Sequence, residues 1–221
     1  MWDSVLLYGG LIIAGAAVLS MIKLRWRRVL IAVGGVLLIF VAFALPAKEK
    51  HAVSRASHLD KAMPVWQFDE RHAIDIAAPP ERVFDAILKV RADEITLFRT
   101  LTTIRCLGRC SGESIMNPPK TIPILEVATR TSFRYLAFDP PHELVVGSTL
   151  APGVLATMNF LVADNGRGGS HLSTETRVFA DSDSRRRQFA AYWRFIHPGS
   201  DIIRRSWLQA IKRRAEGRVD G

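Results

Sequence analysis

The sequence predicts an α+β domain in which an antiparallel sheet curves around a long C-terminal helix. Three observations lead to this prediction. Stretches with strand periodicity fill residues 132–180, helical periodicity follows from residue 184 onward, and a shorter helical pattern follows a first strand near residue 80. Several strands in succession, followed by one long helix, are typical of α+β domains rather than of alternating α/β domains.

Two uncharged runs precede the predicted domain. Val5–Ile22 and Val29–Leu45 contain 18 and 17 residues. At about 1.5 Å per residue, each just spans a hydrocarbon core of roughly 30 Å. We therefore predict a transmembrane hairpin at residues 1–46, with helices at about 5–22 and 29–45. Gly10 and Ala14, four apart, would let the two helices approach closely, although such residues are also common in any membrane helix.

The loop KLRWRR at residues 23–28 sets the predicted orientation. Its four cations favour the cytoplasmic side, which places the C-terminal domain of an integral, two-span membrane protein outside the cytoplasm. An alternative is a cleavable signal at Met21–Ala44, ending in the small-x-small site Ala42-Phe43-Ala44. Both interpretations export the remainder of the chain. Residues 47–67 are polar and without periodicity, which predicts a linker.

The folded domain is predicted at residues 68–216, followed by a tail at 217–221. A strand near Glu70–Ala78 ends at Pro79-Pro80, and the apolar spacing after Glu81 predicts a helix to Val90. We expect short helices at 93–101 and 122–131, with a loop-like stretch at 106–120. Later strands are expected at 132–138, 143–150, 155–163 and 171–180.

The C-terminal helix carries an aromatic stripe. Phe189, Tyr192, Trp193 and Ile196 recur at i, i+3, i+4 and i+7, which places them on one helix face. Pro198-Gly199 is expected to interrupt the helix, and Ser200 or Asp201 could cap its restart.

Two segments resemble a known family. IDIAAPPERVFDAIL at residues 74–88 resembles the signature of the SRPBCC superfamily, the START-like and polyketide-cyclase-like proteins with a helix-grip fold. The TETR strand at Thr174–Arg177, the pair Tyr192-Trp193 and the segment Pro198–Arg205 resemble an uncharacterised, here membrane-anchored, branch. The likeness covers about residues 68–216. It implies a seven-stranded sheet gripping the terminal helix around an elongated cavity for lipids, sterols or polyketides, and no catalytic motif of that branch can be transferred.

Four residues are candidates for contacting a ligand. Glu175 and Arg177 point to the same side of one strand, where they would orient a ligand if that side lines the cavity, or form a surface pair if it faces solvent. Tyr192 and Trp193 lie on the helix stripe, and their hydroxyl and indole NH could orient a ligand, although aromatic residues at this spacing also serve as plain core.

The sequence predicts neither a metal nor a cofactor. None of the six histidines has metal-ligand spacing, and HExxH, GxSxG, P-loop and dinucleotide-binding motifs are absent from the sequence. A single C-x3-C pair, Cys106 and Cys110, is not a zinc site. We interpret these two cysteines as ordinary thiols, with a local disulfide as the alternative.

The net charge is +9, and basic residues cluster near the C-terminus at Arg185–Arg187, Arg204-Arg205 and Lys212–Arg214. We expect a solvated helix face, with anionic lipid head groups as the functional alternative. A nucleic-acid partner is not predicted, because no aromatic-interleaved sheet motif accompanies these runs. The sequence does not set the oligomeric state.

The predicted function is non-catalytic binding of a lipid or other apolar small molecule by a membrane-anchored domain. Glu175, Arg177, Tyr192 and Trp193 would supply the polar contacts. One alternative is a cyclase-like or hydrolytic enzyme in which Glu175 is the acid/base and Arg177 stabilises developing negative charge. The other is a membrane-associated scaffold whose cavity is filled by its own side chains.

Overall fold

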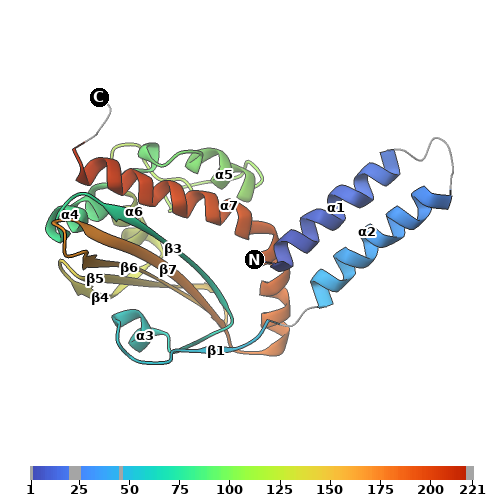
Figure 1. Cartoon of the computed structure of the whole chain (residues 1–221), viewed down its shortest axis with the longest axis horizontal. Coiled ribbons are helices and arrows are strands. Elements are labelled where there is room, and N and C mark those ends of the chain that lie inside the picture. The colour runs from blue at the N-terminus through green and yellow to red at the C-terminus, as the bar shows by residue number, and fades with distance from the viewer. Residues whose placement is uncertain (1, 20–25, 45–46, 218–221) are drawn as a thin grey trace.

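The structure is a computed structural model that describes residues 2–19, 26–44 and 47–217. Its first two helices, α1 (Trp2–Leu19) and α2 (Trp26–Ala44), form a hairpin that projects from the rest of the molecule (Figure 1). The two backbones approach closely at Gly10 and Gly35. A Cβ added at Gly35 would lie 2.9 Å from the backbone nitrogen of Ala14. Small residues therefore shape this helix pair, as one interpretation of Gly10 and Ala14 had it.

The membrane predictions require correction. Within the described residues, no helix combines the length and the apolar character needed to cross a membrane. A span requires about 20 consecutive, predominantly apolar residues. The predicted transmembrane hairpin is not found, and the localisation as a two-span protein with an extracytoplasmic C-terminal domain is wrong. Residues 23–25, half of the basic loop that set the predicted orientation, lie outside the described residues, as does the tail from residue 218.

Residues 47–67, expected to form a polar linker, contain β1 (Lys50–His51), α3 (His58–Ala62) and β2 (Val65–Trp66). Helix α3 begins at a capping box, in which Ser57 Oγ accepts a hydrogen bond from the Asp60 amide at 3.0 Å and Asp60 accepts one from the Ser57 amide at 3.2 Å. Leu59 and Trp66 are buried. The stretch is folded because it contains a helix start and apolar anchors that its polar composition obscures.

Five antiparallel strands form the main sheet, in the order β3-β7-β6-β5-β4. They are β3 (Phe68–Ile76), β4 (Arg134–Asp139), β5 (Glu143–Ala151), β6 (Val154–Asp164) and β7 (Ser170–Ala180). All five were expected from alternating polarity and turn residues. The seven strands implied by the family resemblance exceed the five of this sheet.

Short helices connect the first strand to the later ones. They are α4 (Pro80–Lys89), the 3₁₀ turn η1 (Ala92–Glu94), α5 (Phe98–Arg105) and α6 (Ile124–Thr131). Helix α4 starts with proline, whose missing amide donor costs nothing at that position. The stretch around residues 93–101 was expected as one helix and is divided between η1 and α5.

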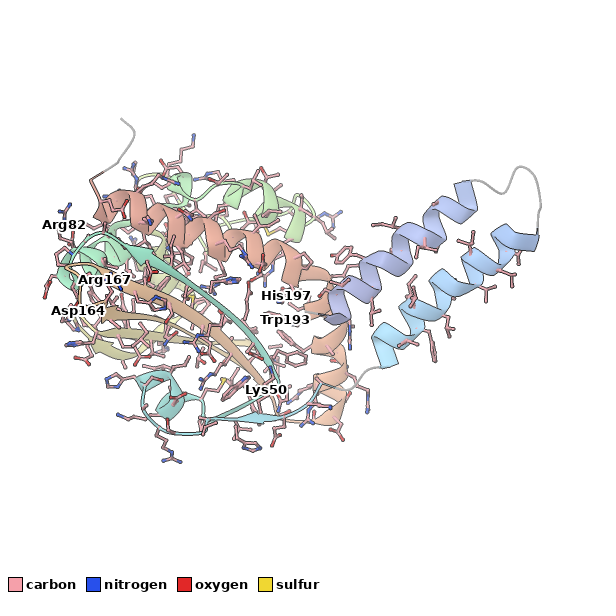
Figure 2. The ribbon with its side chains drawn as sticks, viewed as in Figure 1. Lys50, Arg82, Asp164, Arg167, Trp193 and His197 are labelled. Atoms are coloured by element: carbon pink, nitrogen blue, oxygen red, sulfur yellow. A yellow bond between two sulfur atoms is a disulfide. The ribbon has the colours of Figure 1, made fainter. Side chains whose placement is uncertain are left out.

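The long helix α7 (Asp183–Ala215) begins at Ser182, which accepts a hydrogen bond from the Arg185 amide at 3.4 Å. It passes through Pro198 as one helix, so the expected break at Pro198-Gly199 is wrong. Figure 1 shows that α7 changes direction partway along, and His197, labelled in Figure 2, lies near this bend. A proline inside a helix removes one hydrogen bond and bends the helix without having to end it.

The core lies between the sheet and the helices that cover one of its faces. The larger cluster of buried residues includes Phe160 and Leu172 from the sheet, Ile87 from α4, and Ile211 from α7. A smaller cluster joins Phe68 and Val178 to Phe189 in the first half of α7. The segment of α7 between these clusters is the part that faces the cavity described next.

Candidate functional site: a cavity beneath the long helix

A cavity of about 720 Å³ lies between α5, the middle of α7, the end of β5 and the loop before β4. Its walls are mainly apolar. The large side chains that line it include Phe98, Leu101, Phe133, Phe195, Ile203 and Trp207. A volume of this size is in the range of small-molecule binding sites, which are typically concave and mostly apolar with a few polar groups.

The helical period of α7 produces the long wall of this cavity. Phe195, Gly199, Ile203 and Trp207 are spaced four apart, so they share one face of the helix. Gly199 contributes no side chain to the middle of that face, and a Cβ added there would make ordinary van der Waals contact with Leu101 of α5 at 3.9 Å. From the first helix, Tyr8 reaches the same cavity and donates a hydrogen bond of 2.6 Å to the Phe195 carbonyl.

Two arginines supply the charge of the cavity. Arg204 donates to Thr176 Oγ1 at 2.8 Å, contacts the sulfur of Met158, and places its guanidinium 5.6 Å from the centre of the Trp207 ring. Burial lowers the pKa of Arg204, and the negative charge of Glu70 opposes this effect. Arg105, at the end of α5, is exposed and donates to the Tyr192 hydroxyl at 2.8 Å.

Tyr192 and Trp193, predicted to contact a ligand, lie beside this cavity rather than in its lining. Tyr192 is 38% exposed and borders a smaller hollow with Arg105 and Phe189. Trp193 stacks on Phe189 and lines a polar pocket on the other side of α7. Of the predicted aromatic stripe, Ile196 lines the cavity. The bend in α7 turns the first half of the stripe away from the cavity.

Glu175 and Arg177, also predicted to contact a ligand, lie on the opposite face of the sheet, beneath α3. Arg177 pairs with Glu175 at 2.6 Å and with Asp60 at 2.8 Å, and it donates to the Met63 carbonyl at 3.1 Å. Its guanidinium stacks 3.8 Å from the centre of the Trp66 ring. The two residues meet as the sequence indicated, but their partners are structural groups of the folded stretch 47–67.

A second hollow, of about 410 Å³ and polar in character, lies between β3 and α7. Its central residues are Glu70 and His72, which are buried, and Asp201. His72 Nε2 lies 2.9 Å from Glu70 Oε1 and 3.5 Å from Asp201 Oδ1. Ser200 donates to the other oxygen of Glu70 at 2.7 Å. Figure 2 places Trp193 and His197, which line the same hollow, on the part of α7 that α1 approaches.

The electrostatics of this hollow favour a charged Glu70. Burial by itself would raise the pKa of Glu70, but the hydrogen bond to His72, the positive charge of Arg204 and the hydrogen bond from Ser200 together hold it below its usual value. Burial lowers the pKa of His197, and Glu70 opposes this shift. In this hollow, the Glu70 carboxylate is favoured in its charged form by its hydrogen bonds, and the His197 imidazole is favoured in its neutral form by burial.

Glu70, His72 and Asp201 could hold a metal ion, because one ligand atom from each lies within 4.8 Å of the others. Imidazole and carboxylate groups are ordinary ligands for zinc. Nearby positive charge opposes a divalent cation, since Arg205 donates to both oxygens of Asp201 at 2.9 and 3.2 Å and Arg204 acts on Glu70. Without a metal, Glu70 is already bonded to His72 and Ser200, and Asp201 to Arg205.

Sequence reasoning missed the residues that define both hollows. Ser200 and Glu70 are 130 residues apart, so no local spacing could indicate their contact. Arg204 stands in a basic run that was interpreted as a solvated helix face. One signal was available: Arg204 falls one residue after Ile203 and three before Trp207, on the border of the apolar face.

Cys106 and Cys110 are joined by a disulfide, against the interpretation as two free thiols. The bond closes the turn that follows α5, and Leu107 within that turn lines the cavity. The linkage therefore fixes one part of the cavity rim. Asn159 in β6 is buried and donates to Glu143 at 2.7 Å.

No family model and no curated protein matches this chain. Solved structures that match this chain include protein CV1439 from Chromobacterium violaceum, with 15% identity over 67% of this chain and 97% of the other, and a TM-score of 0.32. Protein MLL2253 from Mesorhizobium loti has 15% identity over 70% and 100% of the two chains, with a TM-score of 0.36. Ara h 8.0201 has 11% identity over 68% and 98%, with a TM-score of 0.35.

Scores at this level carry no argument about function. The fold is assigned from the chain itself, because a five-stranded antiparallel sheet with one long C-terminal helix across it fits a helix-grip arrangement. The α+β prediction and the sheet-and-helix arrangement are thereby confirmed. Family membership and ligand are matters for proposal.

Proposed function

We propose that this chain is a distant SRPBCC-type protein that binds an apolar small molecule, without covalent chemistry, in the cavity beneath α7. The observation that supports the proposal is the cavity of about 720 Å³ with its mainly apolar walls. The cavity is partly open to solvent, and a concave, mainly apolar surface of this kind commonly marks a ligand-binding site. A bound apolar ligand would remove that surface from water.

The affinity would come from removing apolar surface from water. Burial contributes roughly 25 cal/mol per Å² of apolar surface, and a few polar groups would set the orientation of the ligand. Ile203 and Trp207 of α7 and Phe98 of α5 supply the apolar contacts on two sides. The scaffold alternative, in which side chains fill the interior, has less support because the cavity is open.

The enzymatic alternative also has less support. It assigned acid/base chemistry to Glu175 and charge stabilisation to Arg177. Both side chains point toward α3, and Arg177 is occupied by Asp60 and the Met63 carbonyl. A reacting group in the cavity would be separated from them by the sheet.

Nile red, an uncharged apolar dye, tests the proposal. The variant Ile203→Trp fills the cavity, whereas Ile202→Trp places the same side chain on the neighbouring position, which is 40% exposed. We expect Ile203→Trp to weaken dye binding by about tenfold or more, equivalent to about 1.4 kcal/mol, and Ile202→Trp to leave it unchanged. Circular dichroism checks that both variants fold. Failure of the wild-type protein to bind the dye, or equal effects of the two variants, would contradict the proposal.

A further inference from the structure

The charge of the cavity is one-sided. Among the described residues that line it, Arg105 and Arg204 are charged and positive, and none is acidic. The remaining polar lining consists of hydroxyl groups, including those of Ser148, Thr149 and Ser200. Such a lining suits a ligand that is apolar over most of its surface and negatively charged at one end.

Arg204 is the more enclosed of the two arginines and lacks a close counter-ion. Within the described part of the chain, no carboxylate oxygen lies within the 4.0 Å of an ion pair with its guanidinium. Its contacts are one hydroxyl, that of Thr176, the sulfur of Met158 and the face of Trp207. A guanidinium carries five donors and stays protonated in proteins even when burial lowers its pKa.

The carboxylate that acts on Arg204, that of Glu70, already has hydrogen-bond partners of its own. Glu70 acts on Arg204 through space, but its two oxygens accept hydrogen bonds from Ser200 and form the contact with His72. A charge removed from water without an ion-pair partner is costly. The guanidinium of Arg204 therefore keeps N–H donors that no described residue accepts, and Arg204 lines the cavity.

Arg105 is in a different situation. Its guanidinium is exposed and hydrogen-bonded to the Tyr192 hydroxyl, which lies outside the cavity lining. In water the same charge would contribute little to holding an anion. Arg204 is accordingly the group that would anchor a charged ligand.

We propose that the ligand is an amphipathic anion whose head group, a carboxylate or a phosphate monoester, is held by Arg204 while its chain lies along the apolar walls. This inference rests on the proposed function and names the ligand class for the same cavity. The planar fork of a guanidinium matches two oxygens of either head group. The chain would extend toward Leu101 and Phe98, which border the cavity from α5.

The test uses three ligands with the same chain: dodecanoate, dodecyl phosphate and dodecanol. Their affinities for the full chain are measured by displacement of Nile red. We expect the anions to bind about tenfold more tightly than the alcohol, as a hydrogen-bonded charge pair would give. Preference for dodecanoate over dodecyl phosphate, or the reverse, identifies the head group.

The variants Arg204→Met and Arg204→Lys assign the preference to its residue. Arg204→Met is expected to remove the preference for anions while dodecanol still binds, and Arg204→Lys to retain part of it. Arg205→Met is the matched control, because Arg205 is adjacent in sequence but 66% exposed and paired with Asp201. This control should keep the full preference.

The outcomes separate the two proposals. Equal binding of dodecanol and the anions by the wild-type protein, or an anion preference that survives Arg204→Met, overturns the anionic head group and leaves the apolar cavity function standing. Failure of Nile red and all three ligands to bind overturns the proposed function, and the head-group assignment with it. If Arg204→Met does not fold, the wild-type ligand series and Arg204→Lys still decide between these outcomes.

Discussion

The guanidinium groups of Arg177, which is buried, and Arg204, which is half-buried, have opposite surroundings. Arg177 is held between Asp60 and Glu175 and stacks on Trp66, so its charge is compensated on every side. Arg204 faces a cavity and has a hydroxyl and a sulfur as its direct contacts. A compensated charge indicates a structural role, whereas an uncompensated one beside a void indicates a place for a ligand.

The structural role of Arg177 leads to a stability prediction. Arg177→Met should lower the free energy of unfolding by about 3 kcal/mol, because it leaves two carboxylates near each other without their cation. Arg185→Met is the matched control, since Arg185 pairs with Asp181 at the surface and the side chain is 40% exposed, against 7% for Arg177. An exposed pair contributes about 0–1 kcal/mol.

Urea unfolding measures both free energies, and Nile red binding is followed in parallel. Binding by folded Arg177→Met should equal that of the wild-type protein, because Arg177 lies across the sheet from the cavity. If Arg177→Met lowers the free energy of unfolding no more than Arg185→Met does, the pairing of Arg177 with Asp60 and Glu175 is not structural. A specific loss of binding would instead return Arg177 to the ligand site.

For single residues, the sequence indicated which side chains lie together but not which face of the sheet or helix they occupy. Alternation showed correctly that Glu175 and Arg177 share a side of β7, yet either side of a strand is compatible with that pattern. Which side is covered depends on α3, whose place is set by contacts far away in sequence. Similarly, the prediction that Tyr192 and Trp193 face the cavity assumes a straight helix. The bend in α7 turns these two residues away from the cavity.

At the scale of elements, most of the fold could be predicted. The four later strands follow from period-two alternation and turn residues, and α6 at Ile124–Thr131 agrees with the helix expected at 122–131. Errors occurred where packing overrides local preference. Pro198 does not end α7, because the helix packs into the core on both sides of the bend, through Phe189 before it and Ile211 after it.

The α1–α2 pair gives a prediction at this scale. Gly34 and Gly35 are neighbours in α2, but an added Cβ at Gly34 meets nothing within 4 Å, whereas at Gly35 it would lie 2.9 Å from the Ala14 nitrogen and 3.0 Å from the Gly10 carbonyl oxygen. Replacing either glycine with alanine improves helix propensity by about 1 kcal/mol. Only Gly35→Ala forces the two backbones apart.

Hydrogen exchange of the α1 amides distinguishes the two variants. Gly35→Ala should reduce their protection by about tenfold or more, equivalent to about 1.4 kcal/mol. Gly34→Ala should leave it the same or higher. Equal protection in both variants would mean that the close contact at Gly10 and Gly35 does not hold the helices together.

At the scale of the whole molecule, the hairpin of α1 and α2 contributes much less to the buried core than the sheet domain does. Both clusters of buried apolar residues consist of residues from Phe68 onward. Among the described residues, the hairpin contacts the rest of the molecule through Tyr8, whose ring lies 6.4 Å from that of Phe195 and whose hydroxyl bonds the Phe195 carbonyl, and through Ser4, which lines the polar hollow. Many of its apolar side chains are exposed, for example Ile12, Leu30 and Phe40 at 71%, 67% and 69%.

Because the buried core lies outside the hairpin, the behaviour of a chain that starts at Ala47 can be predicted. Residues 47–221 should fold alone and unfold cooperatively, with a midpoint within about 4 °C of the full chain, because both clusters of buried apolar residues lie within this range. The start at Ala47 retains α3, which covers Arg177. A second variant starting at Phe68 should be much less stable, because it loses Asp60 and the buried Leu59 and Trp66.

Thermal unfolding followed by circular dichroism compares the two shortened chains, and sedimentation compares their association with that of the full chain. Removal of the exposed apolar hairpin should reduce self-association, since apolar patches of this extent promote contacts between molecules. Nile red should still bind the chain from Ala47, more weakly because Tyr8 no longer closes one side of the cavity. A shortened chain from Ala47 that fails to fold would show that the hairpin is part of the domain, and that residues 47–67 alone cannot secure the sheet against which α7 encloses its cavity.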